Sequence, residues 1–236
     1  MGRRCYKASY LGGKMIKKRI LETNEGIQNE ITVEIYNEFA KHMRDKGWHN
    51  VDKFIELGIN KGDILEIGPG PGYVGLEILK RSPLAKLTGI EISENMIKLA
   101  TNNAKDYNLE EKVKYVKGNC DNLPFENNTF NGVFSNGSLH EWENPLQAIN
   151  EIYRVLKPGS SFCITDMRRD SNLLLKWSIY LSTKPKEIRP GFLSSYNASY
   201  IKEEIEEILK KSNVENYSVN NEVFGICISG KKIREN

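Results

Sequence analysis

The chain has 236 residues and a formal net charge of +3, with 34 Lys and Arg against 31 Asp and Glu. This length suits one α/β domain of about average size with some extra elements, and the nearly balanced charge demands neither a nucleic acid nor a membrane partner. The sequence contains no apolar run near the roughly 20 residues of a membrane span, and its basic N-terminus lacks the apolar core of a secretory signal. Four scattered cysteines without Cys-x-x-Cys spacing predict free thiols in a reducing cytoplasm: Cys5, Cys120, Cys163 and Cys227.

The N-terminal region divides into a basic arm and a helical segment. Residues 1–20 carry seven Lys or Arg and no acid, so we interpret them as a solvated tail or as an arm that closes over a site. A helix is predicted over residues 27–44 from apolar residues at four-residue spacing, namely Ile27, Ile31, Ile35, Phe39 and Met43. Asn50 is expected to cap a short helix at 51–57.

The middle of the chain alternates between predicted strands and predicted helices. Strands are expected near residues 63–67, 86–90, 113–117, 129–135 and 160–166. Helices are expected near residues 73–81, 94–107 and 144–155, with Ser93 as the cap of the second. This alternation predicts a doubly wound α/β fold, in which helices cover both faces of a parallel sheet.

The last part of the chain is less regular. We predict an amphipathic or buried helix at 171–183, a loop at 184–195 and a helix at 199–211. Two closing strands are expected near 214–220 and 223–230, with Asn220 and Asn221 as the turn between them.

Residues 63–72, Asp-Ile-Leu-Glu-Ile-Gly-Pro-Gly-Pro-Gly, are the most informative stretch for function. An apolar strand there runs into glycines at alternate positions, and a second strand ends in Glu91, whose carboxylate can hold the two ribose hydroxyls of a nucleoside cofactor. Residues 70–75 also satisfy the Gly-x-Gly-x-x-Gly pattern of dinucleotide-binding proteins. Glu66 argues against that alternative, because a carboxylate beside the loop suits a cationic amino-acid group and repels a pyrophosphate.

This loop resembles motif I of the class I S-adenosylmethionine-dependent methyltransferases. Three further segments resemble that family in order and spacing: the Gly-Asn-Cys-Asp-Asn-Leu-Pro-Phe run at 118–125, the strand at 129–135, and Val-Leu-Lys-Pro-Gly at 155–159. The resemblance covers roughly residues 60–168 and is nearest to the branch that includes the ubiquinone and menaquinone biosynthesis methyltransferases. It implies a Rossmann-like, mostly parallel seven-stranded sheet. The implied organisation is an N-terminal arm and helical cap at 1–60, a core at 61–168, and lid helices with antiparallel strands at 169–236 that complete the same domain.

The resemblance implies S-adenosylmethionine as the cofactor, with S-adenosylhomocysteine as its product. The methionine part is expected at the loop and the following strand end, and the ribose at Glu91. The adenine is expected among residues that pack on its ring or bond its edge. The complete expected set is Glu66, Gly68, Gly70, Gly72, Glu91, Ile92, Met96, Asn119, Cys120, Asp121, Ser135 and Asn136. Asn119 replaces the Asp usual in the family, but its side-chain oxygen still accepts a hydrogen bond from the adenine amino group.

Acceptor-facing groups are expected beyond the carboxyl ends of the next two strands. His140 is a candidate general base, and Glu141 either orients it or caps the next helix. Asp166 and Arg168 are candidates for substrate contact, and the Arg favours an anionic acceptor unless it belongs to a surface ion-pair network. Trp177, Tyr180, Tyr196 and Phe192 form either an aromatic wall of the acceptor pocket or part of the core. No metal site is predicted.

We therefore predict a cytoplasmic methyltransferase with a small-molecule acceptor. The sequence leaves open an RNA or tRNA methyltransferase, since the basic arm can track phosphates, although the Asn/Asp-Pro-Pro-Tyr/Phe element of amino-methylating nucleic-acid enzymes is missing. A non-catalytic S-adenosylmethionine-binding protein, a nicotinamide-dependent oxidoreductase and a metalloid methyltransferase using cysteine thiolates are further alternatives. Neither the acceptor nor the oligomeric state can be read from this sequence.

Overall fold

The structure is a computed structural model that describes residues 9–11, 14–16, 18–22 and 26–234. Much of the basic arm that we expected at residues 1–20 lies outside the described residues, and so does Cys5. Two short strands, β1 (Ser9–Leu11) and β2 (Lys14–Ile16), pair antiparallel with each other.

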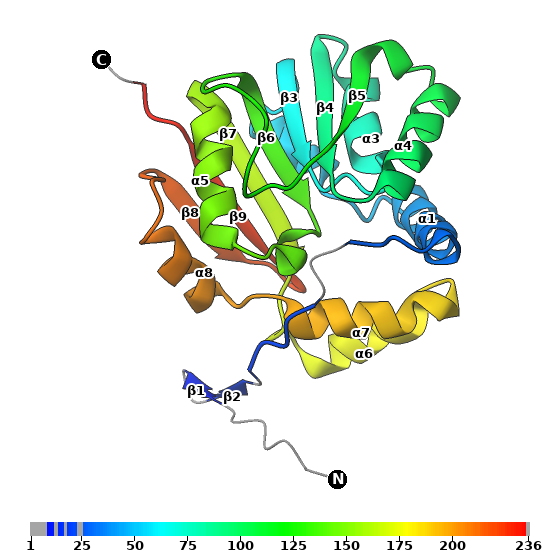
Figure 1. Cartoon of the computed structure of the whole chain (residues 1–236). Coiled ribbons are helices and arrows are strands. Elements are labelled where there is room, and N and C mark those ends of the chain that lie inside the picture. Colours follow the sequence, from blue (N-terminus) through cyan, green and yellow to red (C-terminus); the bar gives the residue numbers. More distant parts are fainter. Residues whose placement is uncertain (1–8, 12–13, 17, 23–25, 235–236) are drawn as a thin grey trace.

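Seven of the described strands form one sheet in the order β5-β4-β3-β6-β7-β9-β8 (Figure 1). Neighbouring strands from β5 to β7 are parallel, whereas β9 pairs antiparallel with both β7 and β8. The fold is therefore the mostly parallel, doubly wound sheet that we predicted. The strands are β3 (Gly62–Ile67), β4 (Ala85–Glu91), β5 (Val113–Lys117), β6 (Phe130–Asn136), β7 (Leu156–Met167), β8 (Tyr217–Asn221) and β9 (Gly225–Lys231).

Successive side chains of a strand point to opposite faces of the sheet, and the buried strands are apolar on both faces. Helices therefore cover both faces of this sheet. On β3, Leu65 and Ile67 pack in the core beneath α5 (Pro145–Val155) and α8 (Lys202–Leu209), which lie in front of the sheet in Figure 1. Ile64 points to the opposite core, beneath α2 (Val51–Glu56) and α3 (Tyr73–Arg81). α4 (Glu94–Asp106) packs on β5 and contacts α3. Two cores thus hold the sheet rigid and position the loops at its edge.

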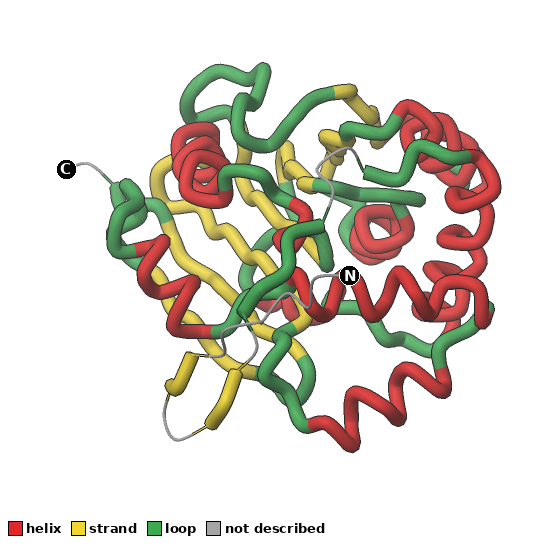
Figure 2. The backbone as a smooth tube through the Cα atoms, turned by 60° about the horizontal axis from the view of Figure 1, so that its bottom comes forward, coloured by secondary structure: helices red, strands yellow, loops and turns green. Residues whose placement is uncertain are grey.

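A cap lies beyond the carboxyl ends of the parallel strands. It consists of α1 (Glu30–Asp45), α6 (Leu173–Ser182), the short η3 (Lys186–Ile188) and α7 (Arg189–Ala198), and Figure 2 shows helices in red beside the yellow strands. Residues 18–22 run along this cap, where the Ile20 N–H donates to the Asn197 carbonyl. Two further short turns, η1 (Glu110–Lys112) and η2 (Leu139–Glu141), follow α4 and β6. Active sites of open α/β sheets lie at this edge.

The N-terminal helices differ from the prediction in three respects. α1 begins at Glu30 rather than at residue 27, because the Asn29 side chain accepts the Thr32 N–H and caps it. The stripe at four-residue spacing is buried only in part, since Ile31 is 69 % exposed whereas Phe39 and Met43 are partly buried. Asn50 stands at the N-cap of α2, but its side chain makes no capping hydrogen bond.

The C-terminal region departs further from the prediction. The predicted loop at 184–195 is largely helical, because Pro190 occupies the first turn of α7, where its missing N–H leaves no hydrogen bond unmade. Asn220 and Asn221 are the last residues of β8, and the turn follows them, closed by the Glu222 N–H donating to the Gly225 carbonyl. β7 begins at Leu156, four residues before the strand that we expected at 160–166, and a register shift against β6 accommodates the added segment.

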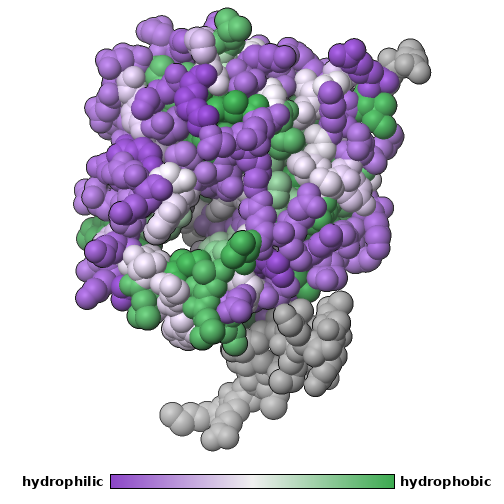
Figure 3. All heavy atoms as spheres, turned by 180° about the vertical axis from the view of Figure 1, so that it is seen from behind, coloured by the Kyte–Doolittle hydropathy of each residue, from purple (hydrophilic) through white to green (hydrophobic). Residues whose placement is uncertain are grey.

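Helix α6 is neither buried nor amphipathic in the sense that we expected. Among the described residues of α6 none is fully buried, and four of its large apolar side chains are exposed, Leu174 being 83 % exposed. Figure 3 shows hydrophobic side chains gathered in this region beside a hollow in the surface. Among the described residues, no helix is long and apolar enough to cross a bilayer.

Candidate functional site

A cavity of about 830 Å³ opens at the carboxyl ends of the parallel strands, beneath the cap. We call one part the cofactor half, made of residues 66–71, 90–92, Met96 and 118–120. We call the other part the acceptor half, made of Glu22, Tyr36, residues 140–141, Asp166, Phe192 and Phe224. Twelve predicted site residues line this cavity: Glu66, Gly68, Gly70, Glu91, Ile92, Met96, Asn119, Cys120, Asn136, His140, Glu141 and Asp166.

The glycine loop needs glycine for both conformation and space. Gly68 has a φ of 64°, and a Cβ there would lie 2.7 Å from the Ser138 Cβ. Gly70 has a φ of 52°, and its N–H donates to Glu91 Oε2 at 3.1 Å. Both conformations are unfavourable for residues that carry a Cβ. Gly72 has a φ of 82° and caps α3, but it lies behind the cavity wall, next to the Tyr115 hydroxyl.

Glu91 is held in place entirely by backbone groups. Its Oε1 accepts N–H groups from Ile92 and Ser93 at 2.9 and 3.0 Å, while Oε2 accepts from Gly70. Burial raises the pKa of Glu91, and these three N–H groups act in the opposite direction. The side chain is therefore fixed at the end of β4, where a carboxylate accepts hydrogen bonds from vicinal hydroxyls.

Glu66 lies deeper, between β3 and α3. Burial raises its pKa to about 8, the charge of Glu91 raises it further, and the N–H of Gly75 opposes both. Its Oε2 is buried without a hydrogen-bond partner, and any side chain at Gly75 would collide with this carboxylate. An unpaired acid at this depth is suited to an incoming cationic group.

The remainder of the cofactor half is apolar, and the N-terminal region covers it. Ile92 and the buried Met96 line the wall next to Asn119 and Cys120. Asn119 Oδ1 accepts the Asp121 N–H at 3.4 Å, which orients the turn, whereas Asp121 itself lies outside the cavity lining. Ser93 Oγ donates to the Ile27 carbonyl at 2.6 Å and anchors the segment that precedes α1 over this region.

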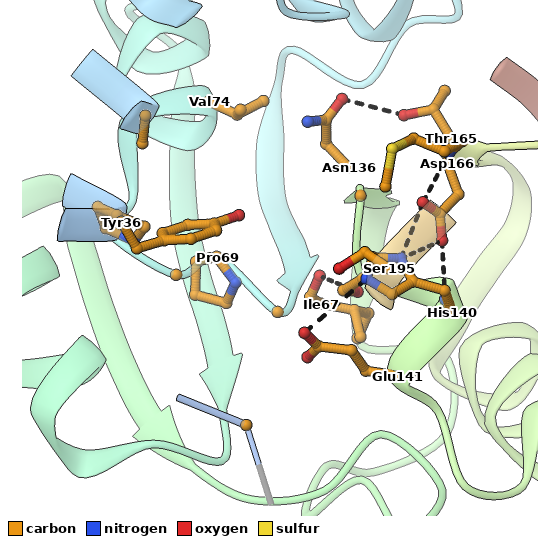
Figure 4. A pocket seen from close by; sticks show the side chains of 18 of the residues that line it. Tyr36, Ile67, Pro69, Val74, Asn136, His140, Glu141, Thr165, Asp166 and Ser195 are labelled. Carbon is orange, nitrogen blue, oxygen red and sulfur yellow. Dashed lines mark hydrogen bonds and ion pairs between the residues drawn. The ribbon is translucent and has the colours of Figure 1, made fainter. Parts of the chain in front are cut away.

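His140 and Asp166 form a buried pair between the ends of β6 and β7 (Figure 4). The His140 Nδ1 lies 2.9 Å from Asp166 Oδ2, and the His140 backbone N–H donates to the same oxygen at 2.7 Å. Burial alone lowers the pKa of His140, but the charge and hydrogen bonds of Asp166 outweigh it and raise the pKa to about 9. The imidazole is therefore mostly protonated near neutral pH, which disfavours the general-base role that we predicted for it.

Carboxylates face the other side of this imidazole. The His140 Nε2 lies 3.6 Å from Glu22 Oε2 and 3.9 Å from Glu141 Oε1. The donor atoms of these three residues lie within 4.8 Å of one another, a spacing that suits either a metal ion or, when His140 is protonated, ion pairs with the two carboxylates. Burial raises the pKa of Glu141 to about 7, opposed by the charge of His140. Tyr36 projects from α1 into the same space, and burial raises the pKa of its hydroxyl.

A neutral hydrogen-bond network backs the cavity. Asn136 Oδ1 accepts from Asn50 Nδ2 at 2.8 Å and from Thr165 Oγ1 at 3.0 Å. Ser135 is fully buried behind the wall, where its hydroxyl donates to the Ile67 carbonyl, so it does not line the cavity. Asn50 thus ties α2 to β6 rather than capping its own helix. Glu141 does not cap α5 either, because Asn144 accepts the Gln147 N–H in that position.

Four other predicted site residues lie outside the described cavity lining. Arg168 forms an ion pair with Asp170 at 2.7 Å, which is the network that we considered as the alternative to substrate contact. Trp177 and Tyr180 pack edge to face at 5.4 Å on α6. The Tyr196 hydroxyl donates to the Arg169 carbonyl from a buried position.

Several cavity residues were missed from the sequence. Tyr36 lines the cavity from α1 together with Phe39 and Met43, which belong to the predicted apolar stripe, but Tyr36 itself lies outside that stripe. Glu22 lies in a segment without a regular pattern. Phe224 lies in the turn between β8 and β9, which was predicted about two residues too early, at Asn220 and Asn221. The spacing of Tyr36, Phe39 and Met43 was visible in the sequence, whereas nothing local marks Glu22 or Phe224 as cavity residues.

Comparison with known proteins connects this geometry to a family. Residues 65–164 match the family described as methyltransferase domain. An uncharacterized methyltransferase, YdaC, of Bacillus subtilis (strain 168) is 36% identical over 50% of this chain and 63% of its own length. The ubiquinone/menaquinone biosynthesis C-methyltransferase UbiE of Cereibacter sphaeroides (strain ATCC 17029 / ATH 2.4.9) is 28% identical over 49% of this chain and 46% of its own length. The chain thus spans less than two thirds of the length of these relatives.

A solved structure supports the fold over most of the chain. The S-adenosyl-L-methionine-dependent methyltransferase of Methanococcus maripaludis superposes with a TM-score of 0.71 at 23% identity, covering 92% of this chain and 99% of that protein. At this identity the likeness concerns the fold alone. The fold of the whole chain and the match of residues 65–164 thus agree: this part of the chain is similar to the methyltransferase domain family.

Proposed function

We propose that this protein transfers the methyl group of S-adenosylmethionine to a small-molecule acceptor. The observation that carries the proposal is that one cavity joins two different environments. Glu91 and the glycine loop provide a backbone-lined nucleoside site, and a buried group of titratable side chains adjoins it. The UbiE relative, named for C-methylation in quinone biosynthesis, supports a small acceptor.

The residues of this chain have distinct proposed roles. S-adenosylmethionine supplies an electrophilic methyl group, so the protein needs mainly to exclude water and to align a nucleophile. Glu91 would hold the ribose, and Glu66 would face the amino group of the methionine part. Ile92 and Met96 would pack on the adenine, with Asn119 and Cys120 at its edge. The His140–Asp166 pair fixes the loop that bounds the acceptor, and Glu141 is positioned to exchange a proton with it.

No observation on the described residues favours the alternative functions that the sequence left open. A nicotinamide dinucleotide would place its pyrophosphate at the glycine loop, where the buried carboxyl group of Glu66 offers it no positive charge. Among the described cysteines, Cys120 alone lines the cavity, whereas Cys163 and Cys227 lie in the core beneath α2 and α3, so no two thiols meet in the cavity to bind a metalloid.

Calorimetric titration with S-adenosylhomocysteine, with NAD in parallel, tests the proposal. We expect micromolar affinity for S-adenosylhomocysteine and a loss of about a hundredfold or more in Glu91→Ala, since a fixed acceptor of two hydrogen bonds disappears. Glu94→Ala is the matched control, because Glu94 is exposed and pairs with Lys117 on the surface. Binding of NAD alone, or equal losses in both variants, would refute the proposal.

A further inference from the structure

The acceptor half carries an excess of negative charge with few compensating cations. Glu22, Glu141 and Asp166 lie around the single cationic side chain of His140. Arg44 is the one Lys or Arg side chain among the described lining residues, and it pairs with Asp45. An anionic acceptor would therefore meet net repulsion at the point where it must approach the methyl group.

The neighbouring Arg and Lys side chains have other hydrogen-bond or ion-pair partners. Arg19 donates to the carbonyls of Ala198 and His140 and stacks over the Tyr200 ring at 4.0 Å. Lys53 pairs with Glu222. Arg168, which we expected to favour an anionic acceptor, is engaged by Asp170. The sequence-based expectation of an anionic substrate thus loses its structural support.

One of these acids lacks a hydrogen-bond donor. Glu22 Oε2 is buried and accepts no hydrogen bond, although His140 Nε2 lies 3.6 Å away as an ion-pair partner. This carboxylate oxygen faces the space that Glu141 also borders. A buried carboxylate oxygen in this state costs free energy until a donor reaches it. An ammonium group offers three donors and a positive charge, whereas an alcohol offers one donor and no charge.

Aromatic rings complete the surroundings of this space. Tyr36 projects from α1, and Phe192 stacks against Phe224 with ring centroids 6.0 Å apart. Aromatic faces attract cations and pack against hydrocarbon substituents. The cavity thus offers both carboxylates and aromatic rings, a combination that recognises an organic ammonium ion.

We propose that the methyl acceptor is a primary or secondary amine, which binds as its ammonium form between Glu22 and Glu141. The inference rests on the proposed methyltransferase function and names its substrate class. Glu141 takes one proton from the ammonium nitrogen, which frees the lone pair. That lone pair forms a bond to the methyl carbon of the sulfonium donor while the carbon–sulfur bond breaks and its electron pair moves to sulfur. The products are an N-methylated ammonium ion, a neutral thioether and protonated Glu141.

The pKa of Glu141 agrees with this assignment. Burial raises it to about 7, so near neutral pH the group exists in both forms and can accept and later release a proton. His140 is already protonated by virtue of Asp166 and acts as a fixed positive neighbour of Glu141. Glu141 is therefore the proposed base, and His140 is a positioning residue.

Matched probes test the substrate class. Phenethylamine, phenethyl alcohol and phenylacetate have nearly the same shape but differ in charge, and fragments of this size bind with Kd values near 1 mM. Each is titrated into the protein saturated with S-adenosylhomocysteine. We expect the amine to bind about tenfold or more tightly than the alcohol, and phenylacetate to bind most weakly. Glu22→Gln and Glu141→Gln should each reduce the preference for the amine about fivefold, whereas Glu207→Gln, an exposed substitution on α8, should leave it unchanged.

The outcomes separate this inference from the proposed function. Failure of S-adenosylhomocysteine to bind would refute the function itself. If it binds, equal affinity for amine and alcohol, preference for phenylacetate, or binding of none of the probes would overturn the amine assignment. Amine preference that appears only when Mg²⁺, Mn²⁺ or Zn²⁺ is added, and disappears with a chelator, would also overturn it in favour of a metal at Glu22, His140 and Glu141. Retained affinity for S-adenosylhomocysteine in both Gln variants shows that they are folded.

Discussion

The two halves of the cavity are built in opposite ways. The cofactor half consists largely of backbone, namely the positive φ angles of Gly68 and Gly70 and the N–H groups that hold Glu91. The acceptor half consists of side chains from separate elements, such as Tyr36 on α1, Asp166 on β7 and Phe192 on α7. A backbone-built site leaves a short, ordered signature in sequence. A site assembled from distant side chains depends on the packing of the whole cap.

The largest expected effect tests the backbone half. Gly68→Ala should weaken S-adenosylhomocysteine binding about a hundredfold or more, because the new methyl group meets Ser138 and displaces the loop. Gly47→Ala is the matched control, since Gly47 has a similar φ of 67° but no atom within 4 Å of the added Cβ. Both variants carry the cost of a left-handed residue, of about 1 kcal/mol, and only Gly68→Ala adds a collision. Equal affinity in the two variants, measured by calorimetry, would show that the loop tolerates side chains.

The next effect tests the side-chain half through its central pair. In Asp166→Asn, the pKa of His140 should fall from about 9 toward the ordinary 6.5, because the charge that holds the imidazolium is lost. NMR titration of the histidine Cε1–H signals measures this value. A shift of this size corresponds to a stability difference on the order of 3 kcal/mol.

The sign of the pH dependence follows from the direction of this shift. The pKa of His140 is raised in the folded protein, so the pair stabilises the fold fully below pH 6.5 and loses its contribution as the pH rises through about 9. The unfolding free energies of wild type and Asp166→Asn, measured in urea, should therefore converge over that range. A difference independent of pH would show that Asp166 stabilises the loop through hydrogen bonds alone.

A smaller effect returns to the cofactor half. Glu66 has a pKa of about 8 in the unliganded protein, so it is mostly protonated at pH 7. If an ammonium group of the ligand contacts it, S-adenosylhomocysteine binding should release about 0.9 proton at pH 7 and tighten as the pH rises to about 8. Calorimetry in buffers of different ionisation enthalpy measures this release. Glu66→Gln should lower the release by the same amount, and an unchanged value would assign the proton to another group.

The sequence predicted the core strands closely because their signals are local. β5 was expected at 113–117 and is found there, and β3 and β4 differ from expectation by only one residue at an end. Each is a short stretch rich in apolar and β-branched residues between turn residues, and such a local pattern is enough to predict a strand. The cofactor-binding residues could also be predicted, because the glycines of a tight loop and a carboxylate at a strand end are recognised from a few neighbouring residues.

The cap was predicted less well, for a physical reason. Helices α6 and α7 lie over an open cavity rather than a filled core. The apolar residues of α6 therefore do not mark a buried face, as apolar residues of a core helix would. Pro190 was taken as a loop residue although a proline is compatible with the first turn of a helix. The acceptor half joins Glu22 to Glu141 across more than a hundred residues, and no periodicity within one sequence records that contact.

The smallest expected effect separates the cap's surface from its cavity wall. Trp177 is half exposed on α6 and packs only on Tyr180 among the described aromatic residues, whereas Phe192 lines the cavity from α7. Trp177→Ala should change S-adenosylhomocysteine affinity less than about twofold and the unfolding free energy by less than about 1 kcal/mol. Phe192→Ala should leave S-adenosylhomocysteine affinity similar but weaken phenethylamine binding about fivefold, because an aromatic wall of the ammonium site is lost. A larger loss of amine binding in Trp177→Ala than in Phe192→Ala would mean that α6 folds inward when ligands bind, and that the aromatic residues predicted from sequence complete the acceptor half in the liganded state.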